Sequence, residues 1–332
     1  MTGSADASLV SEARDCGLLE RMSVVSFAAN DVIFREGDHG TTFLLIGSGS
    51  VAITRKSSDV ERVGPGSILG ELALLTGQRR STTVCAQTPV QGWWGTAEDF
   101  DAMLQFDSIR MLLHRIAIDR LAVNIDSIAF ITAKGFAGYL RPLLPSDREE
   151  YVKNVRTFSS KAKRLRFFTG GEPSPALIDY LLAVDYLNHF AWIVLDAREA
   201  AGGTGPGGAL PGVAIARFIR SDDDPTSADT AFAVSEQCHG LGLATVLLGA
   251  LAIAAEFSGI STFTADVLIE NAAMRKVLAH GGATWLRSEP GIVGARLAVE
   301  DAGGVLDPRL AADIRRSVKA FGLANETLLG TS

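Results

Sequence analysis

Cysteine is scarce in this sequence, with three residues, Cys16, Cys85 and Cys238, that lie far apart. An odd number at this spacing matches neither a disulfide framework nor the paired ligands of a zinc site. We therefore expect no structural disulfide and no metal site.

Positive charge is also limited, because 31 lysines and arginines against 38 acidic residues give a formal net charge of −7. A nucleic-acid-binding domain usually carries a large basic surface, and the sequence predicts none. The basic run at residues 161–166 is better explained as the solvated face of a helix.

A membrane-spanning run and a signal peptide are missing too. Residues 240–255 carry no charge, but this segment is shorter than the roughly 20 residues that cross a bilayer, so a buried helix is expected. Residues 1–6 have neither the basic nor the apolar region of a signal peptide. We expect a cytoplasmic protein without membrane association.

The chain is long and apolar enough for more than one folded domain. It has 332 residues, of which 47% are hydrophobic and 21% are charged. These values predict about two domains, each with its own core. The glycine- and proline-rich segment 202–212 is expected to be a loop.

One segment combines an acid and an arginine in a way that suits a cyclic nucleotide. Glu71 lies in an apolar run after Gly70, and Arg80 is followed by hydroxyl residues. A carboxylate can accept from the ribose hydroxyls, and a guanidinium with nearby donors can bind the cyclic phosphate. Backbone amides freed at Gly70 add phosphate donors. The candidate nucleotide-binding residues are Gly70, Glu71, Leu72, Ala73, Arg80, Ser81 and Thr82.

Short apolar strands with glycine turns surround this segment and predict a small antiparallel barrel or jelly roll. Residues 20–105 resemble the β-roll of cyclic-nucleotide-binding domains, and the resemblance implies cyclic AMP as the ligand. The alternative is that Glu71 and Arg80 form an ordinary ion pair at a strand end. The spacing of apolar residues from Phe100 to Thr132 predicts a helix, which either covers the nucleotide or simply packs. Residues 132–136 are expected to be a linker.

A strand, a glycine turn and a helix follow one another in the second half of the chain. The strand is predicted at Ala228–Val234, the turn at His239–Thr245 and the helix at Val246–Phe257. A pyrophosphate binds well at the amino end of a helix, whose first amides have no internal partners. Gly240 and Gly242 allow the backbone to approach it without a Cβ.

This order of elements resembles the GNAT N-acetyltransferases, and the resemblance implies acetyl-CoA as cosubstrate. The turn resembles the GNAT signature, with His239 where glutamine or arginine is usual and Leu241 where a basic residue is common. The later GNAT motif begins at Asn271, whose side chain is expected near the CoA arm. The candidate cofactor-binding residues are Phe232, Val234, His239, Gly240, Gly242, Ala244, Thr245 and Asn271.

The whole chain resembles the cyclic-AMP-regulated protein lysine acetyltransferases, the actinobacterial Pat family. A lysine amine must lose a proton before it attacks a thioester, so the site needs an acceptor for that proton. Asp229 is the candidate, because the family has a glutamate at this place of the strand. Glu236 lies just beyond the strand end as a second candidate. Asp229 can also be an exposed strand-end residue without a catalytic role.

The expected architecture is α+β with two domains. A jelly-roll cyclic-nucleotide-binding domain is placed at residues 10–132, a GNAT α/β domain with a mixed sheet at 136–300, and a helical tail at 301–332. Pro308 suits a first helical turn, and Gly322 is expected to end this helix. The resemblance implies that the tail is a lid; a helix packed on its domain is equally consistent.

The expected function is a cyclic-AMP-regulated lysine acetyltransferase whose target, by the resemblance, is an acyl-CoA synthetase. The alternative is a sensor with a GNAT fold that binds cyclic AMP and an acyl-CoA without turnover. The departures at Asp229, His239 and Leu241 are the features that favour this alternative.

Overall fold

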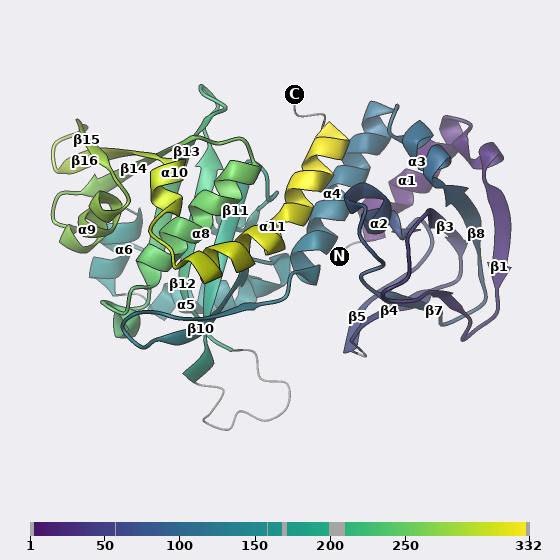
Figure 1. Ribbon diagram of the computed structural model, residues 1–332, viewed down its shortest axis with the longest axis horizontal. Coiled ribbons are helices and arrows are strands. Elements are labelled where there is room, and N and C mark those ends of the chain that lie inside the picture. The colour runs from purple at the N-terminus through teal and green to yellow at the C-terminus, as the bar shows by residue number, and fades with distance from the viewer. Residues whose placement is uncertain (1–2, 57, 158, 168–170, 199–209, 330–332) are drawn as a thin grey trace. The chain divides into compact units, whose positions relative to one another are not determined.

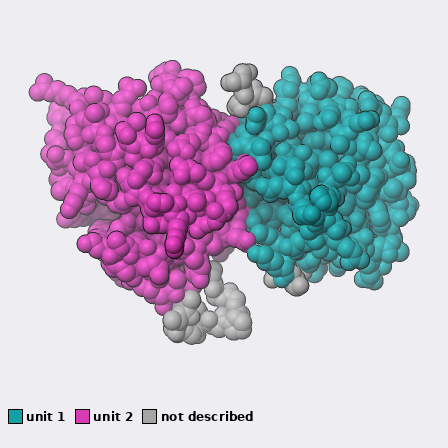
Figure 2. Space-filling view, viewed as in Figure 1, with its two compact units in different colours: residues 1–124, 320–332 teal, residues 125–319 magenta. Residues whose placement is uncertain are grey.

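The structure is a computed structural model that describes residues 3–56, 58–157, 159–167, 171–198 and 210–329. The chain divides into two compact units (Figure 1, Figure 2). Unit 1 comprises residues 1–124 and 320–332, and unit 2 comprises residues 125–319. The loop expected at residues 202–212 lies mostly outside the described residues. Among the described helices, none is both long and apolar enough to cross a membrane.

Unit 1 is a β-roll flanked by helices. Its elements are α1 (Gly3–Asp15), η1 (Leu18–Arg21), β1 (Ser23–Phe27), β2 (Val32–Phe34), β3 (Thr42–Ser48), β4 (Val51–Arg55), β5 (Ser58–Val63), β6 (Ile68–Leu69), α2 (Glu71–Thr76), β7 (Thr83–Ala86), β8 (Val90–Thr96), α3 (Ala97–Met103) and α4 (Asp107–Asn124). The strands form two four-stranded sheets, in the orders β1-β8-β3-β6 and β2-β7-β4-β5. Their pairs are antiparallel, as a β-roll requires.

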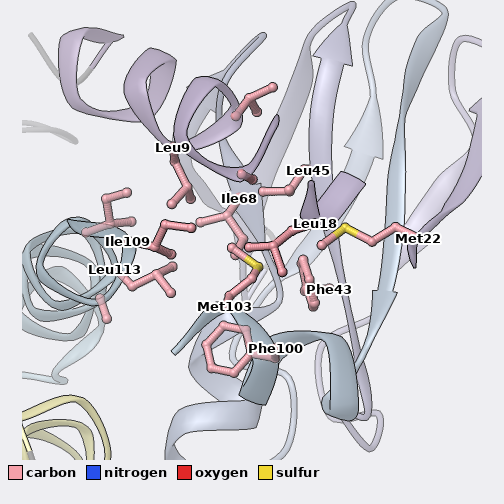
Figure 3. Close-up of a cluster of buried hydrophobic side chains, with 14 of the residues drawn as sticks. Leu9, Leu18, Met22, Phe43, Leu45, Ile68, Phe100, Met103, Ile109 and Leu113 are labelled. Atoms are coloured by element: carbon pink, nitrogen blue, oxygen red, sulfur yellow. The ribbon is translucent and has the colours of Figure 1, made fainter. Parts of the chain in front are cut away.

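A cluster of buried side chains joins the helices of unit 1 to one of its sheets (Figure 3). Ile109 and Leu113 of α4 meet Phe43 and Leu45 of β3, and Leu328 from the end of the chain belongs to the same cluster. A fully buried leucine contributes about 1.5–3 kcal/mol through removal of apolar surface from water. The end of helix α11 therefore contributes to the core of unit 1.

Unit 2 is a sheet of eight strands with helices along it. Its elements are β9 (Ile128–Ile131), β10 (Ala137–Pro142), η2 (Pro145–Asp147), α5 (Arg148–Thr157), α6 (Ser160–Phe167), α7 (Pro175–Leu182), β11 (His189–Asp196), β12 (Gly212–Arg220), β13 (Ser227–Val234), η4 (Glu236–Cys238), α8 (Leu243–Phe257), β14 (Thr262–Leu268), α9 (Ala272–His280), β15 (Thr284–Arg287), β16 (Ile292–Ala298) and α10 (Val299–Gly303). Helix α11 (Pro308–Leu329) begins in unit 2 and ends in unit 1.

The sheet of unit 2 is mixed, with strand order β15-β16-β14-β13-β12-β11-β10-β9. Strands β13 and β14 run parallel, and the other neighbouring pairs are antiparallel. The helix α8 connects the two parallel strands, as a parallel pair requires a crossover. The predicted mixed sheet is confirmed.

The alternation of side chains along β11 shows which helices cover which face of the sheet. Trp192 donates its indole N–H to the Ala250 carbonyl of α8 at 3.0 Å. Its neighbours Ala191 and Ile193 pack with buried side chains of α5 and α7 on the opposite face. Because successive strand residues point to opposite faces, α8 covers one face of the sheet and α5 and α7 cover the other.

Three expectations about local structure are wrong. The helix expected to reach Thr132 ends at Asn124, and the alternating residues Ile128–Ile131 form β9. The expected linker 132–136 is the turn of a hairpin, in which Thr132 and Phe136 bond to each other. Gly322 does not end the last helix. The apolar repeat of this helix continues with Ala324 and Leu328, and the burial of these two side chains outweighs the cost of about 1 kcal/mol for a helical glycine.

Candidate functional site

Arg80 lies buried at the centre of the candidate nucleotide site, with 6% of its surface exposed. Its main chain is fixed on both sides, because Arg80 N donates to the Asp38 carbonyl at 2.8 Å and Gly37 N donates to the Arg80 carbonyl at 2.9 Å. Its guanidinium donates to the carbonyls of Gly70 at 2.8 Å and Thr42 at 2.7 Å. The orientation of the cation is thus set before any ligand binds.

Two glycines leave the space that the guanidinium occupies. A Cβ at Gly70 would lie 2.3 Å from Nη1 of Arg80. A Cβ at Gly40 would lie 3.2 Å from the same nitrogen and 2.2 Å from Cβ of Ala73. Gly70 also has a φ of +87°, which side chains other than glycine rarely adopt. Glycine is therefore required at position 70 both for space and for conformation.

Glu71 begins α2 and is almost completely buried, with 2% of its surface exposed. It pairs with Arg120 of α4, whose Nη1 lies 2.8 Å from its Oε1. The same nitrogen donates to the carbonyl of Ile68 at 2.6 Å. Arg120 was not singled out in the sequence, although an arginine at an apolar position of a helix is a signal of a buried partner.

The structure brings most of the predicted nucleotide-binding residues together. Burial lowers the pKa of Arg80, and the nearby carboxylates of Glu71 and Asp38 oppose this effect. Ala73 packs beside Gly40, and Leu72 is half-buried in the same helix. Ser81 and Thr82 follow Arg80 in the chain and are partly exposed. This arrangement offers a cation, a carboxylate and the amino end of a short helix to one ligand.

The second candidate site lies where β13 and β14 separate. Their parallel pairing ends at Asp229 opposite Thr264, whereas β13 continues to pair with β12 as far as Val234. Alternate residues of an antiparallel ladder direct their N–H and C=O groups away from the partner strand. Residues 230–234, which include Phe232 and Val234, thus present backbone groups on the side that β14 has left.

The turn before α8 has the backbone that the sequence pattern predicted. Gly240 and Gly242 have φ values of +76° and +87°. Gly242 is the N-cap of α8, and its carbonyl accepts from Val246 N at 3.1 Å. The amides of Leu243, Ala244 and Thr245 therefore have no acceptor within the helix. These amides, together with the positive end of the helix dipole, suit a phosphate group.

His239 and Asn271 have defined structural roles. Nε2 of His239 lies 3.0 Å from the carbonyl of Val234, so this nitrogen carries the proton and donates it. His239 thereby fixes the turn to the end of β13. Asn271 is the N-cap of α9, where its Oδ1 accepts from Met274 N at 3.1 Å.

Arg198 stands near this turn and was not singled out in the sequence. Its guanidinium donates three hydrogen bonds to the carboxylate of Asp196, the shortest at 2.6 Å, and its Nη2 lies 3.6 Å from Sγ of Cys238. A basic residue is absent at Leu241, and Arg198 provides a cation close to the same loop. The hydrogen bonds to Arg198 also lower the pKa of Asp196.

The Asp229 side chain reaches solvent on one side but is surrounded by protein on the others, and its pKa is raised to about 6. The largest cause is desolvation by the surrounding protein, followed by the negative charge of Asp266, while Arg166 lowers the pKa. Glu236 lies beyond the strand end and accepts a hydrogen bond from Ser159. Of the two acids, Asp229 is the one at the separation of the strands. Asp266 and Arg166 were not predicted from the sequence.

A family model of the cyclic nucleotide-binding domain matches residues 24–107. A solved structure of a cAMP-binding acyltransferase from Mycobacterium smegmatis is 30% identical, covers 98% of this chain and 99% of that chain, and has a TM-score of 0.48. The GNAT domain of S. lividans PAT is 25% identical, covers 52% of this chain and 96% of that chain, and has a TM-score of 0.45.

The acetyltransferase Pat of Mycolicibacterium smegmatis is 37% identical over 294 residues. This match spans 87% of the present chain and 85% of the relative. Together with the matched domain and the mixed sheet of unit 2, it confirms the resemblance and the fold class inferred from the sequence, a cyclic-nucleotide-binding β-roll followed by an α/β acetyltransferase domain. The chain belongs to the family of the acetyltransferase Pat.

Proposed function

We propose that this protein transfers an acetyl group from acetyl-CoA to a lysine of a target protein, under the control of cyclic AMP. Family membership supports an acyltransferase, and the domain at residues 24–107 supports regulation by a cyclic nucleotide. The proposal adds the acyl donor, the acceptor and the effector.

The observation that carries the proposal is the separation of β13 from β14 at Asp229, followed along the chain by the amino end of α8. Backbone groups of residues 230–234 suit the amides of a pantetheine arm, and the amides of residues 243–245 suit a pyrophosphate. The two sets of backbone groups follow each other along the protein chain, as the pantetheine arm and the pyrophosphate follow each other in CoA. This combination favours an acyl-CoA over an isolated phosphate ligand.

The chemistry requires one proton acceptor near the thioester. A lysine ammonium has a pKa of about 10.4 and must lose a proton before its nitrogen can attack. Asp229 takes this proton, directly or through a water, and its raised pKa makes it a stronger base than an ordinary aspartate. Acetyl-CoA supplies the thioester. The new C–N bond forms, the C–S bond breaks, and the second nitrogen proton goes to the departing thiolate.

Stabilisation of the developing oxyanion is assigned to the backbone N–H groups of Phe232 and Val234, which face away from β12. Such donors are worth about 2.7–4 kcal/mol when they are aimed at the charge that forms in the transition state. Cyclic AMP is assigned to Arg80 and Glu71. An acyl-CoA synthetase is the proposed target, and this assignment rests on the family resemblance alone.

An acetyl-transfer assay tests the proposal. The full-length chain is incubated with acetyl-CoA and an acyl-CoA synthetase, with and without cyclic AMP, and acetylated lysines are identified by mass spectrometry. We expect transfer that depends on the nucleotide. Acetyl-CoA binding without transfer to the synthetase or to lysine peptides would instead favour the sensor.

A further inference from the structure

Two carboxylates share one face of the sheet where β13 and β14 separate. Asp229 is opposite Thr264 in the parallel pairing, and Asp266 lies two residues further along β14. Because side chains alternate along a strand, Asp266 points to the same face as Thr264 and hence as Asp229. Both acids are exposed, so a side chain of another protein can reach them.

Helix α6 is fixed to the ends of both strands on this side. Ser159, just before α6, donates to Glu236, which follows β13. Arg164 of α6 forms an ion pair of 3.0 Å with Glu270, which follows β14. The helix also packs against β13. These contacts hold α6 next to both acids and explain why Arg166 influences Asp229.

Further charged and polar groups that face Asp229 and Asp266 come from neighbouring elements. Arg217 of β12 lies opposite Ala231 and is 1% exposed, with Tyr151 of α5 3.4 Å from its Nη2. Arg296 of β16 is exposed and lies opposite Thr264. Ser288 donates to Oδ1 of Asp266 at 3.3 Å.

Two neighbouring carboxylates repel each other, and a cation between them removes this repulsion. The effect is visible in Asp229, whose raised pKa is due in part to the charge of Asp266. Arg166 compensates Asp229 in part, and Asp266 has Ser288 as its neutral donor. The pair therefore favours a compact cation with several N–H donors, such as a primary ammonium.

We propose that Asp266 is a positioning residue for the acceptor, and that it binds the lysine ammonium together with Asp229 where the two strands separate. This inference rests on the proposed function. Asp229 then accepts one proton from the nitrogen, while the Asp266 carboxylate accepts hydrogen bonds from the remaining N–H groups. The role differs from that of the base, because Asp266 acts on acceptor binding and on the proton affinity of Asp229.

The variant Asp266→Asn tests this role in the full-length protein with a lysine peptide and acetyl-CoA. We expect KM for the peptide to rise about 2- to 5-fold, the effect of losing one solvent-accessible ion pair. We expect kcat at pH 8 to fall by less than about 3-fold, since the base remains. The acidic limb of the profile of kcat/KM against pH should move down by about 0.5 unit or more, because a like charge is lost beside Asp229.

The control is Asp223→Asn, which removes an equal charge from an exposed loop residue of the same unit. It should leave KM and the pH profile unchanged, and Asp266→Glu should largely restore the wild-type KM. Wild-type KM together with an unmoved acidic limb in Asp266→Asn would overturn the inference.

An NMR titration of the Asp229 carboxyl carbon separates this inference from the proposed function. It needs no turnover and should show the same downward shift in Asp266→Asn. If the wild type transfers no acetyl group, the proposed function fails, and the titration alone still decides whether the two acids are coupled. An unshifted titration overturns the pair in either case.

Discussion

Arg120 and Glu71 form a buried ion pair that joins helix α4 to the start of helix α2. Nη1 of Arg120 lies 2.8 Å from Oε1 of Glu71, and the side chains are 15% and 2% exposed. The same guanidinium donates to the Ile68 carbonyl, one residue before the end of β6. The carboxylate proposed for the ribose is therefore held by a residue almost fifty positions later in the chain.

We expect Arg120→Ala to destabilise unit 1 by about 3–5 kcal/mol, because it leaves the Glu71 carboxylate buried without its cation. Thermal unfolding followed by calorimetry measures this loss, and a titration with cyclic AMP should show weaker binding. Arg115→Ala, an exposed position of the same helix, is the control and should change neither. Unchanged stability and affinity in Arg120→Ala would show that Glu71 does not depend on the pair.

Arg80→Ala should weaken cyclic AMP binding by about 30- to 1000-fold, or about 2–4 kcal/mol, because the phosphate loses a charge-assisted partner. The neighbouring Arg79→Ala is a matched control, since Arg79 is exposed and donates to the Gly37 carbonyl. Isothermal titration calorimetry compares the two. Equal affinities for the two variants would move the phosphate contact away from Arg80.

The sequence predicted the glycine turns at both candidate sites better than the partners of their acids. Gly70, Gly240 and Gly242 were recognisable because each has a positive φ that local sequence dictates. The partners of the acids could not be derived in this way. Arg120 meets Glu71 through packing of α4 on the β-roll, and Asp266 meets Asp229 through strand pairing across a helical crossover.

The predicted boundaries of helices were wrong for a related reason. Residues 128–131 follow a long helix, and only their pairing with β10 decides that they form a strand. Gly322 is a common helix end, but burial of Leu328 in the core of unit 1 keeps the helix intact beyond it. Both outcomes depend on tertiary contacts that local propensity does not contain.

Asp229→Asn should lower kcat by about 10²- to 10⁴-fold while acetyl-CoA binding stays nearly unchanged, because the amide cannot accept the proton. Asp229→Glu is expected to retain activity or raise it. In the wild type, kcat/KM should fall as pH drops through about 6, where the raised pKa of Asp229 leads to its protonation. Stopped-flow detection of released thiol gives these rates.

The control for this prediction is Glu236→Gln, which removes the acid that bonds to Ser159 beyond the end of β13. Glu236→Gln should leave unchanged the fall of kcat/KM at acidic pH. Normal turnover in Asp229→Asn, combined with a loss in Glu236→Gln, would transfer the role of base to Glu236.

The end of helix α11 packs on helix α2 in unit 1, which begins at Glu71, a residue proposed to bind the nucleotide. Oγ1 of Thr327 donates to the Leu75 carbonyl at 3.4 Å, and Leu328 and Leu75 belong to the same buried cluster. Asn325, which is 2% exposed, bonds to Nε2 of His114 on α4 at 2.8 Å. A ligand that shifts α2 or α4 therefore acts on the same contacts that hold the end of helix α11.

We expect Leu328→Ala to loosen this end, to raise activity without nucleotide and to flatten the response to cyclic AMP. A nucleotide changes activity only through its different affinities for the two states, and a coupling of about 1–3 kcal/mol gives roughly 5- to 150-fold activation. Glu326→Gln, at an exposed position of the same turn, is the control and should keep the wild-type response. Rates measured over a cyclic AMP titration, on variants shown by circular dichroism to be folded, provide the comparison. If Leu328→Ala keeps the full activation, the end of α11 does not transmit the signal, and the ion pair between Arg120 and Glu71 becomes the next element to test, because it connects the same two helices without involving the tail.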